Sequence, residues 1–108
     1  MPSQSNKLRF GLDEVVIEKI NKIFSVYHKI QQVIVYGSRA KGNYRPSSDI
    51  DLVIEGKAIT LSQLLKIENE LDDLLLPYKM DLSLLHKINS EDLLDHIKRV
   101  GVTFYKKS

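Results

Sequence analysis

The chain has 108 residues, of which 43% are hydrophobic and 28% charged, with a formal net charge of +2 and no cysteine. These values exclude disulfides, a thiolate zinc site and, because no apolar run is long enough, a membrane-spanning helix. Lysines and arginines are scattered among acids, so strong nucleic-acid binding is not expected. We expect one cytoplasmic domain over residues 1–108, with a flexible polar start over residues 1–8.

The first half of the chain predicts two helices and two strands around a glycine-containing turn. Apolar residues recur every three or four positions over residues 12–28, which indicates an amphipathic helix. The β-branched run Val33–Tyr36 predicts a buried strand that stops at Gly37. A short helix is expected over Ser38–Lys41, and a second strand over residues 50–55.

The second half of the chain continues this alternation of helices and strands. The expected elements are a helix that begins with the capping box Thr60 to Gln63 and stops by Pro77, a strand over residues 79–85, a helix from Ser90 to Gly101, and an edge strand over residues 102–105. The order predicts an α/β fold, but periodicity leaves the strand directions open.

Gly37 and Ser38 follow the first strand and can form a phosphate-binding turn. Glycine lacks a Cβ, so a phosphate can approach its backbone closely, and the serine hydroxyl and nearby N–H groups can donate to phosphate oxygens. Arg39, Lys41 and Arg45 surround the turn and would supply countercharge. Taken alone, these residues also suit an ordinary strand-to-helix turn with a solvated charged surface. We expect all five to bind nucleotide if acids join them.

Two acidic residues follow the turn, at the start of the second expected strand. Asp49 and Asp51 alternate at the start of the second strand, so their side chains share a face, roughly 6.5–7 Å apart. Like charges among apolar neighbours are costly without a cation, which argues against a merely solvated strand edge. Carboxylates beside phosphates favour Mg²⁺. Asp81, among apolar neighbours on the strand expected over residues 79–85, is a candidate further ligand. Two Mg²⁺ ions, about 3.5–4 Å apart, would stabilise an in-line displacement. Asp81 could instead be the general base.

Gly37-Ser38, ten residues, and then Asp49-x-Asp51 resemble the signature of the nucleotidyltransferase superfamily that includes DNA polymerase beta. Within this superfamily the chain looks most like the minimal nucleotidyltransferases. The resemblance implies a small mixed β-sheet with helices on one face and the acidic site on the other. It also implies Asp81 as the third catalytic aspartate, Mg²⁺ as cofactor, and ATP or another NTP as substrate.

The same resemblance implies a partner. A chain of 108 residues accommodates a catalytic core and little else, and minimal nucleotidyltransferases commonly pair with a helical HEPN-type toxin. In that family the antitoxin AMPylates a tyrosine of the toxin, so a hetero-oligomer is expected. Two alternatives remain open: the partner supplies a pocket for a small-molecule acceptor, or the chain is a non-catalytic antitoxin that neutralises by binding.

Several other side chains receive no catalytic role at this point. His28, His86 and His96 share no metal-ligand spacing, and we interpret all three as non-catalytic. Tyr36 is interpreted as a core residue, and Tyr44 as a surface tyrosine.

Overall fold

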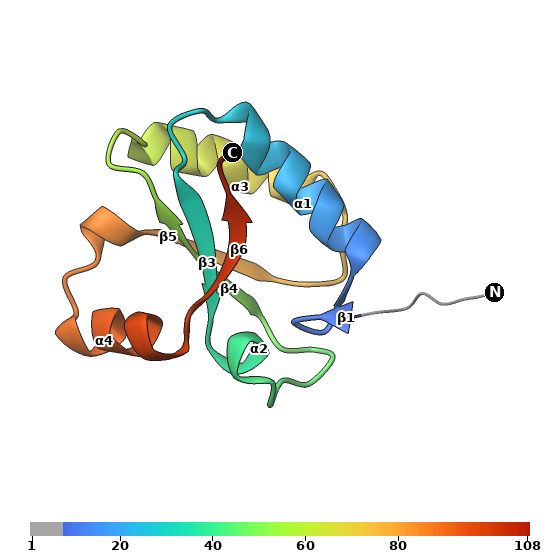
Figure 1. Ribbon diagram of the computed structural model, residues 1–108. Helices are drawn as coiled ribbons and strands as arrows, with labels where there is room; N and C mark the ends of the chain where they lie inside the picture. The colour runs from blue at the N-terminus through green and yellow to red at the C-terminus, as the bar shows by residue number, and fades with distance from the viewer. Residues whose placement is uncertain (1–7) are drawn as a thin grey trace.

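The computed structural model describes residues 8–108. Figure 1 shows a twisted sheet flanked by helices. The elements in chain order are β1 (Leu8–Arg9), β2 (Leu12–Asp13), α1 (Glu14–Val26), β3 (Gln32–Tyr36), α2 (Ser38–Lys41), β4 (Ile50–Glu55), α3 (Leu61–Asp72), β5 (Met80–Leu84), the 3₁₀ helix η2 (Leu85–Lys87), α4 (Glu91–Val100) and β6 (Val102–Lys106). Within residues 8–108, no helix combines the length and the apolar character needed to cross a membrane.

The main sheet is mixed, with strand order β5-β4-β3-β6. β3 runs antiparallel to both β4 and β6, whereas β4 and β5 are parallel. Parallel neighbours need a crossover connection, and α3 provides it. Because of these directions, the end of β3 and the starts of β4 and β5 lie together at one end of the sheet.

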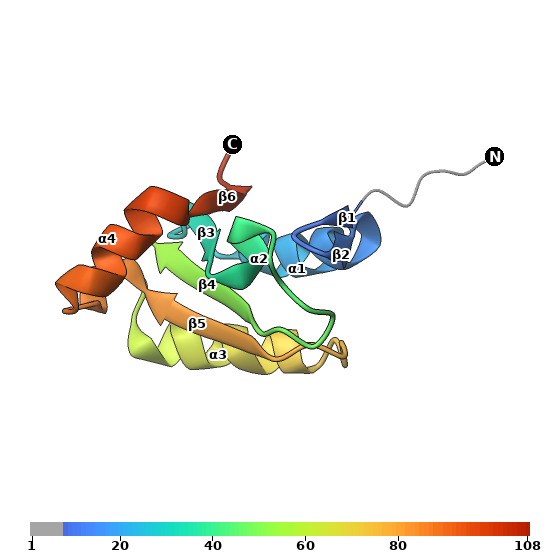
Figure 2. The same ribbon diagram turned by 90° about the horizontal axis from the view of Figure 1, so that it is seen from below.

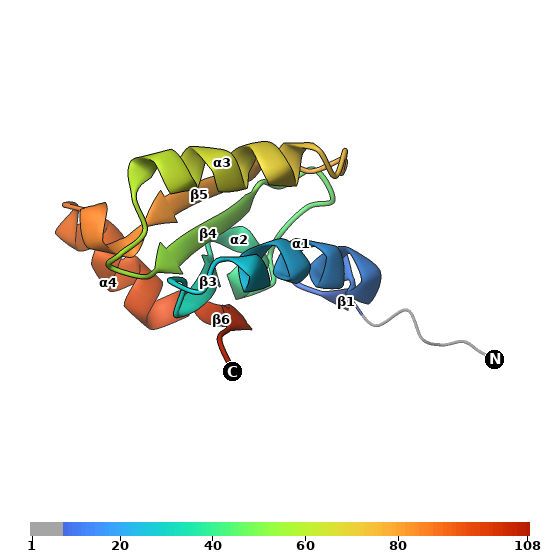
Figure 3. The ribbon, with the colours of Figure 1, turned by 90° about the horizontal axis from the view of Figure 1, so that it is seen from above.

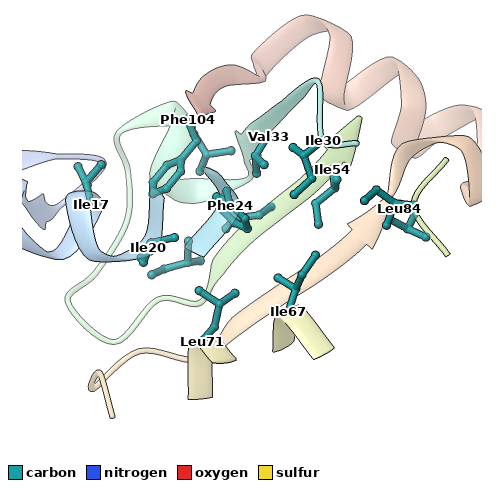
Figure 4. Close-up of a cluster of buried hydrophobic side chains, with 14 of the residues drawn as sticks. Ile17, Ile20, Phe24, Ile30, Val33, Ile54, Ile67, Leu71, Leu84 and Phe104 are labelled. Atoms are coloured by element: carbon teal, nitrogen blue, oxygen red, sulfur yellow. The ribbon is translucent and has the colours of Figure 1, made fainter. Parts of the chain in front are cut away.

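Helices α1 and α3 lie on the same face of the sheet (Figure 3) and enclose the main core. Phe24 of α1 and Ile67 of α3 are fully buried there, against strand residues such as Val33 and Ile54 (Figure 4). Burying one such side chain contributes roughly 1.5–3 kcal/mol, so this face stabilises the fold. At its margin the Tyr27 hydroxyl donates to a carboxylate oxygen of Glu70, which links the end of α1 to α3.

Helix α4 lies on the opposite face (Figure 2). Ile34 and Tyr36 alternate with the core residues of β3, and α4 packs on them. The His96 ring meets the Tyr36 ring edge-on, with centroids 6.2 Å apart, and a Cβ at Gly101 would lie 2.7 Å from Ile34 Cγ2. The predicted fold class is confirmed. The expectation of helices on one face holds for α1 and α3, while α4 covers part of the other.

The local signals for helix and strand ends were accurate where side chains cap the backbone. Thr60 accepts from the Gln63 backbone N–H at 3.2 Å, and Gln63 Oε1 accepts from the Thr60 N–H at 3.0 Å. Ser90 likewise caps α4 through the Leu93 N–H. The short helix α2 and the strand β4 have the predicted bounds.

The predicted start of the first helix was wrong. Leu12 and Asp13 form β2, which pairs with β1 in a two-stranded hairpin, and α1 begins at Glu14. The turn of this hairpin holds Phe10 and Gly11 at positive φ. The expected flexibility of residues 1–8 lies outside the described residues, except that Leu8 belongs to β1.

Candidate active site

Three neighbouring strands place a row of polar side chains on the face opposite the main core. Tyr36 of β3 is the register partner of Asp51 of β4. Asp51 is in turn the partner of Asp81 of β5. Partnered residues on adjacent strands project from the same face of a sheet, so the two aspartates are direct neighbours. Asp49 precedes β4 and is exposed, as is Asp81, whereas Asp51 is half-buried.

The Gly37 turn is in contact with this row. Gly37 has φ 76° and ψ −154°, a conformation that is essentially restricted to glycine. A Cβ at this position would lie only 2.6 Å from Asp51 Oδ2. The turn therefore packs its bare backbone against the Asp51 carboxylate. Ser38, half-buried, comes next as the first residue of α2.

Several negatively charged carboxylates lie close together around Asp51. Burial raises the pKa of the Asp51 carboxyl, and the charges of Asp81 and Asp49 raise it further, while His96 lowers it. The pKa of Tyr36 is also raised, first by burial and then by the charge of Asp51. A hydrogen bond from Ser83 partly opposes that rise. The charges of Asp81 and Asp49 therefore act on Asp51 through space and disfavour its ionisation.

This donor set suits a hard divalent cation. Carboxylate oxygens are the ligands that Mg²⁺ takes in phosphate-processing sites, and a bound cation would relieve the repulsion around Asp51. Within residues 8–108, no three histidine, cysteine or acidic side chains are drawn together closely enough to enclose a metal ion. The fit to a hard divalent cation therefore rests on the chemistry of the carboxylates, which form an open and acidic arrangement.

The cations predicted to bind nucleotide divide into two groups. Lys41, the last residue of α2, and Arg45, in the loop that follows it, are both exposed, and their nucleotide-binding role stays a prediction. The prediction for the Arg39 side chain was wrong, because only 2% of Arg39 is exposed. Its guanidinium donates to the backbone carbonyls of Phe10, Pro46 and Ser48 instead of facing solvent.

Sequence reasoning missed the neighbours of the acids. Tyr36, interpreted as a core residue, is half-buried and is the register partner of Asp51, and Ser83 lowers the pKa of Tyr36. His96, interpreted as non-catalytic, contacts Tyr36 and influences Asp51 through its charge. Strand alternation predicts that Ser83 shares a face with Asp81, and the same alternation could have placed Tyr36 on the acidic face. No sequence signal predicts how α4 crosses the sheet, so the position of His96 could not be found.

This geometry agrees with comparisons to known proteins. Residues 18–108 match the family model described as Polymerase beta, Nucleotidyltransferase. The chain therefore belongs to this nucleotidyltransferase family. It is also 33% identical over 76 residues to a Methanocaldococcus jannaschii protein, MJ1217, that is provisionally named a protein adenylyltransferase. The match covers 69% of this chain and 76% of that protein. The predicted family and nucleotidyltransferase activity are thereby confirmed.

Solved structures share the fold. One, a toxin–antitoxin with AMP-PNP, matches with a TM-score of 0.69 at 21% identity, over 85% of this chain and 74% of the other. Another is a complex of a tri-AMPylated Shewanella oneidensis HEPN toxin with an MNT antitoxin. It matches with a TM-score of 0.64 at 19% identity, over 87% and 72% of the two chains. At these identities the likeness shows the fold.

Proposed function

We propose that this chain transfers AMP from ATP to a tyrosine hydroxyl of a HEPN-type toxin and acts as its antitoxin. The observation that carries the proposal is the packing of the Gly37 turn against the Asp51 carboxylate, with Asp81 in register beside it. A turn suited to phosphate thus adjoins carboxylates suited to a divalent cation. The names of the M. jannaschii relative and of the two solved complexes support AMP as the group transferred and a HEPN protein as the acceptor.

The reaction joins the acceptor oxygen to the α-phosphorus of ATP. The bond from that phosphorus to the oxygen that bridges to the β-phosphate breaks, and pyrophosphate leaves with the electron pair. We assign the outer phosphates to Gly37 and Ser38, with Lys41 and Arg45 as countercharge. The hydroxyl proton passes to solvent or to Asp81, if Asp81 is the general base.

Asp49, Asp51 and Asp81 would hold Mg²⁺ in this proposal. The bound ions would supply charge neutralisation at the phosphates and a lower pKa for the attacking hydroxyl. The role of the protein is to keep the three carboxylates at one end of the sheet, where the turn also ends. We further propose that the chain works in the cytoplasm, where ATP is available, and as a hetero-oligomer with its acceptor.

Intact-mass spectrometry of a purified HEPN-type partner tests the proposal directly. Incubation with the chain, ATP and Mg²⁺ should add one or more AMP groups to the partner. Asp51→Asn, which keeps the size and shape of the side chain, should add none. Tryptic mapping should then find the modification on tyrosine.

The competing functions give different results in the same experiment. A tight complex with no mass gain from any of the four nucleotides would indicate an antitoxin that works by contact alone. Pyrophosphate release that requires an added small molecule, with the partner present but unmodified, would indicate a two-protein enzyme with a small-molecule acceptor.

A further inference from the structure

Arg39 stands apart from the other charged residues because it is buried. Of the charged side chains in the described part of the chain, it alone falls in the buried class, with 2% of its surface exposed. It is the second residue of α2 and follows directly after Ser38 in the phosphate turn. No carboxylate among residues 8–108 lies within salt-bridge distance of its guanidinium. A buried cation without a carboxylate is costly unless hydrogen bonds compensate it.

The compensation comes from backbone carbonyls. Arg39 Nη2 donates to Ser48 O at 2.8 Å and to Pro46 O at 3.2 Å, and Nε donates to Ser48 O at 3.1 Å. Nη1 donates to Phe10 O of the N-terminal hairpin at 2.8 Å. The rings of Tyr44 and Tyr78 flank the guanidinium carbon, with centroids 5.3 and 5.1 Å away. Only the planar fork of arginine can reach these acceptors together, so lysine is not an equivalent replacement.

The loop that Arg39 binds leads directly into the acidic site. Ser48 N–H donates to Arg45 O at 2.9 Å, and Ser48 Oγ accepts from the Arg45 N–H at 2.8 Å, which closes a turn. Two further carbonyls of this turn, those of Pro46 and Ser48, point to Arg39. Ser48 is covalently joined to Asp49, so fixing the Ser48 carbonyl also fixes the peptide plane that leads to Asp49.

We propose that Arg39 is a positioning residue that holds Asp49 beside Asp51. The inference rests on the proposed function, in which Asp49 is a ligand of the divalent cation. Arg39 connects the phosphate turn to the loop before Asp49. The turn and the Asp49 carboxylate are therefore held in a fixed position relative to each other. Without it, the turn of residues 45–48 loses the donors for two carbonyls, and Asp49 is free to move away from Asp51.

A double-mutant cycle on cation binding tests the proposal. Mn²⁺, a spectroscopic probe for Mg²⁺, is titrated by electron paramagnetic resonance in the presence of a non-hydrolysable ATP analogue. Arg39→Lys should weaken Mn²⁺ binding by about tenfold, within the range for residues that orient metal ligands. In the Asp49→Asn background the same change should have little further effect, because the residue through which Arg39 acts is already lost. In the Asp81→Asn background it should retain its tenfold effect, since Asp81 lies on a different strand.

The outcomes separate this inference from the proposed function. If Asp49→Asn alone leaves Mn²⁺ affinity unchanged, Asp49 is not a ligand, and both the proposed metal site and this inference are overturned. If Asp49→Asn weakens binding but Arg39→Lys is equally harmful in every background, Arg39 only maintains the fold and the inference alone is wrong.

A second variant keeps the test decisive if Arg39→Lys does not fold. Pro46→Gly loosens the turn that Arg39 binds without changing any buried charge. It should weaken Mn²⁺ binding in the wild-type background but not in the Asp49→Asn background. Hydrogen exchange should report faster exchange of the Ser48 amide. A loosened turn with unchanged Mn²⁺ affinity would overturn the proposal, because Asp49 would then not depend on this loop.

Discussion

Gly37→Ala is the most direct test of the contact between the Gly37 turn and the Asp51 carboxylate. The substitution adds a single methyl group, which would lie 2.6 Å from Asp51 Oδ2. This distance is shorter than any relaxed contact between carbon and oxygen, so the carboxylate or the turn must move. The backbone is strained as well, because φ 76° with ψ −154° suits glycine and almost no other residue.

The expected magnitudes follow from these two effects. Backbone strain of this kind costs roughly 1–3 kcal/mol, and each 1 kcal/mol lowers the Tm of a domain of this size by about 4–8 °C. Displacing the Asp51 carboxylate by about 1 Å from its productive position should lower the rate of AMP transfer by about 100-fold. The loss of activity should therefore be much larger than the loss of stability would produce at 25 °C, where the variant remains folded.

Gly42→Ala is the matched control. Gly42 also has positive φ, at 87°, but no atom lies within 4 Å of the position that a Cβ would take. It should lower the free energy of unfolding by about 1 kcal/mol through backbone strain alone and leave transfer intact. Thermal denaturation followed by circular dichroism, beside transfer rates with ATP and Mg²⁺, measures both effects. Equal activity of the two variants would refute the reasoning, since the Gly37 contact would then not matter to catalysis.

Three further predictions concern individual side chains. Asp51→Asn should lower the rate of transfer by more than about 100-fold. In metal-free buffer at pH 7 it should raise the Tm, because it removes a charge that the surroundings of Asp51 disfavour. This gain in Tm should shrink as the pH falls through the raised pKa of Asp51, because the wild-type carboxyl also becomes neutral there. Asp81→Asn should leave ATP binding, measured by fluorescence, nearly unchanged while lowering kcat by about 100-fold; turnover at the wild-type rate would remove Asp81 from the site. Tyr27→Phe should cost about 1 kcal/mol in urea unfolding at pH 7. Burial and Glu70 raise the pKa of Tyr27 from 10.0 to about 12, so wild-type stability should fall as the pH rises through that interval, a decline that the variant should lack.

The parts of the fold that the sequence predicted well depend on neighbouring residues. The bounds of α2 and β4 follow from Gly37, the polar loop and Gly56. The capping box involves only the four residues from Thr60 to Gln63. Alternation along β4 likewise places Asp51 on the face opposite the core residues Ile50 and Leu52 without knowledge of the fold. Signals of this kind are local, because they arise from backbone conformation and from side chains that bond to the backbone within a few residues of themselves.

The errors concern contacts between distant residues. Arg39 looks like a solvated cation next to a phosphate turn, and only the arrival of Phe10 and the 46–48 loop makes it a buried donor. The hairpin at Phe10 has strands of two residues each, too short for any periodic pattern. His96 influences Asp51 through its charge only because α4 lies on the second face of the sheet. Local periodicity does not determine these arrangements, because they depend on how the assembled elements pack.

The spacing of the motif has a physical explanation in the sheet. β3 is antiparallel to β4, so the chain leaves β3 at Gly37 and must return to the same end of the sheet to begin β4 at Ile50. The intervening residues form α2 and one tight turn, and Arg39 connects the two through Ser48 O. Because β5 is parallel to β4, its first residues also begin at this end and bring Asp81 level with Asp51. One antiparallel and one parallel pairing therefore suffice to gather the Gly37 turn and three carboxylates at one end of the sheet. The same connection brings the backbone carbonyl of Ser48, the residue before Asp49, to the buried Arg39 guanidinium.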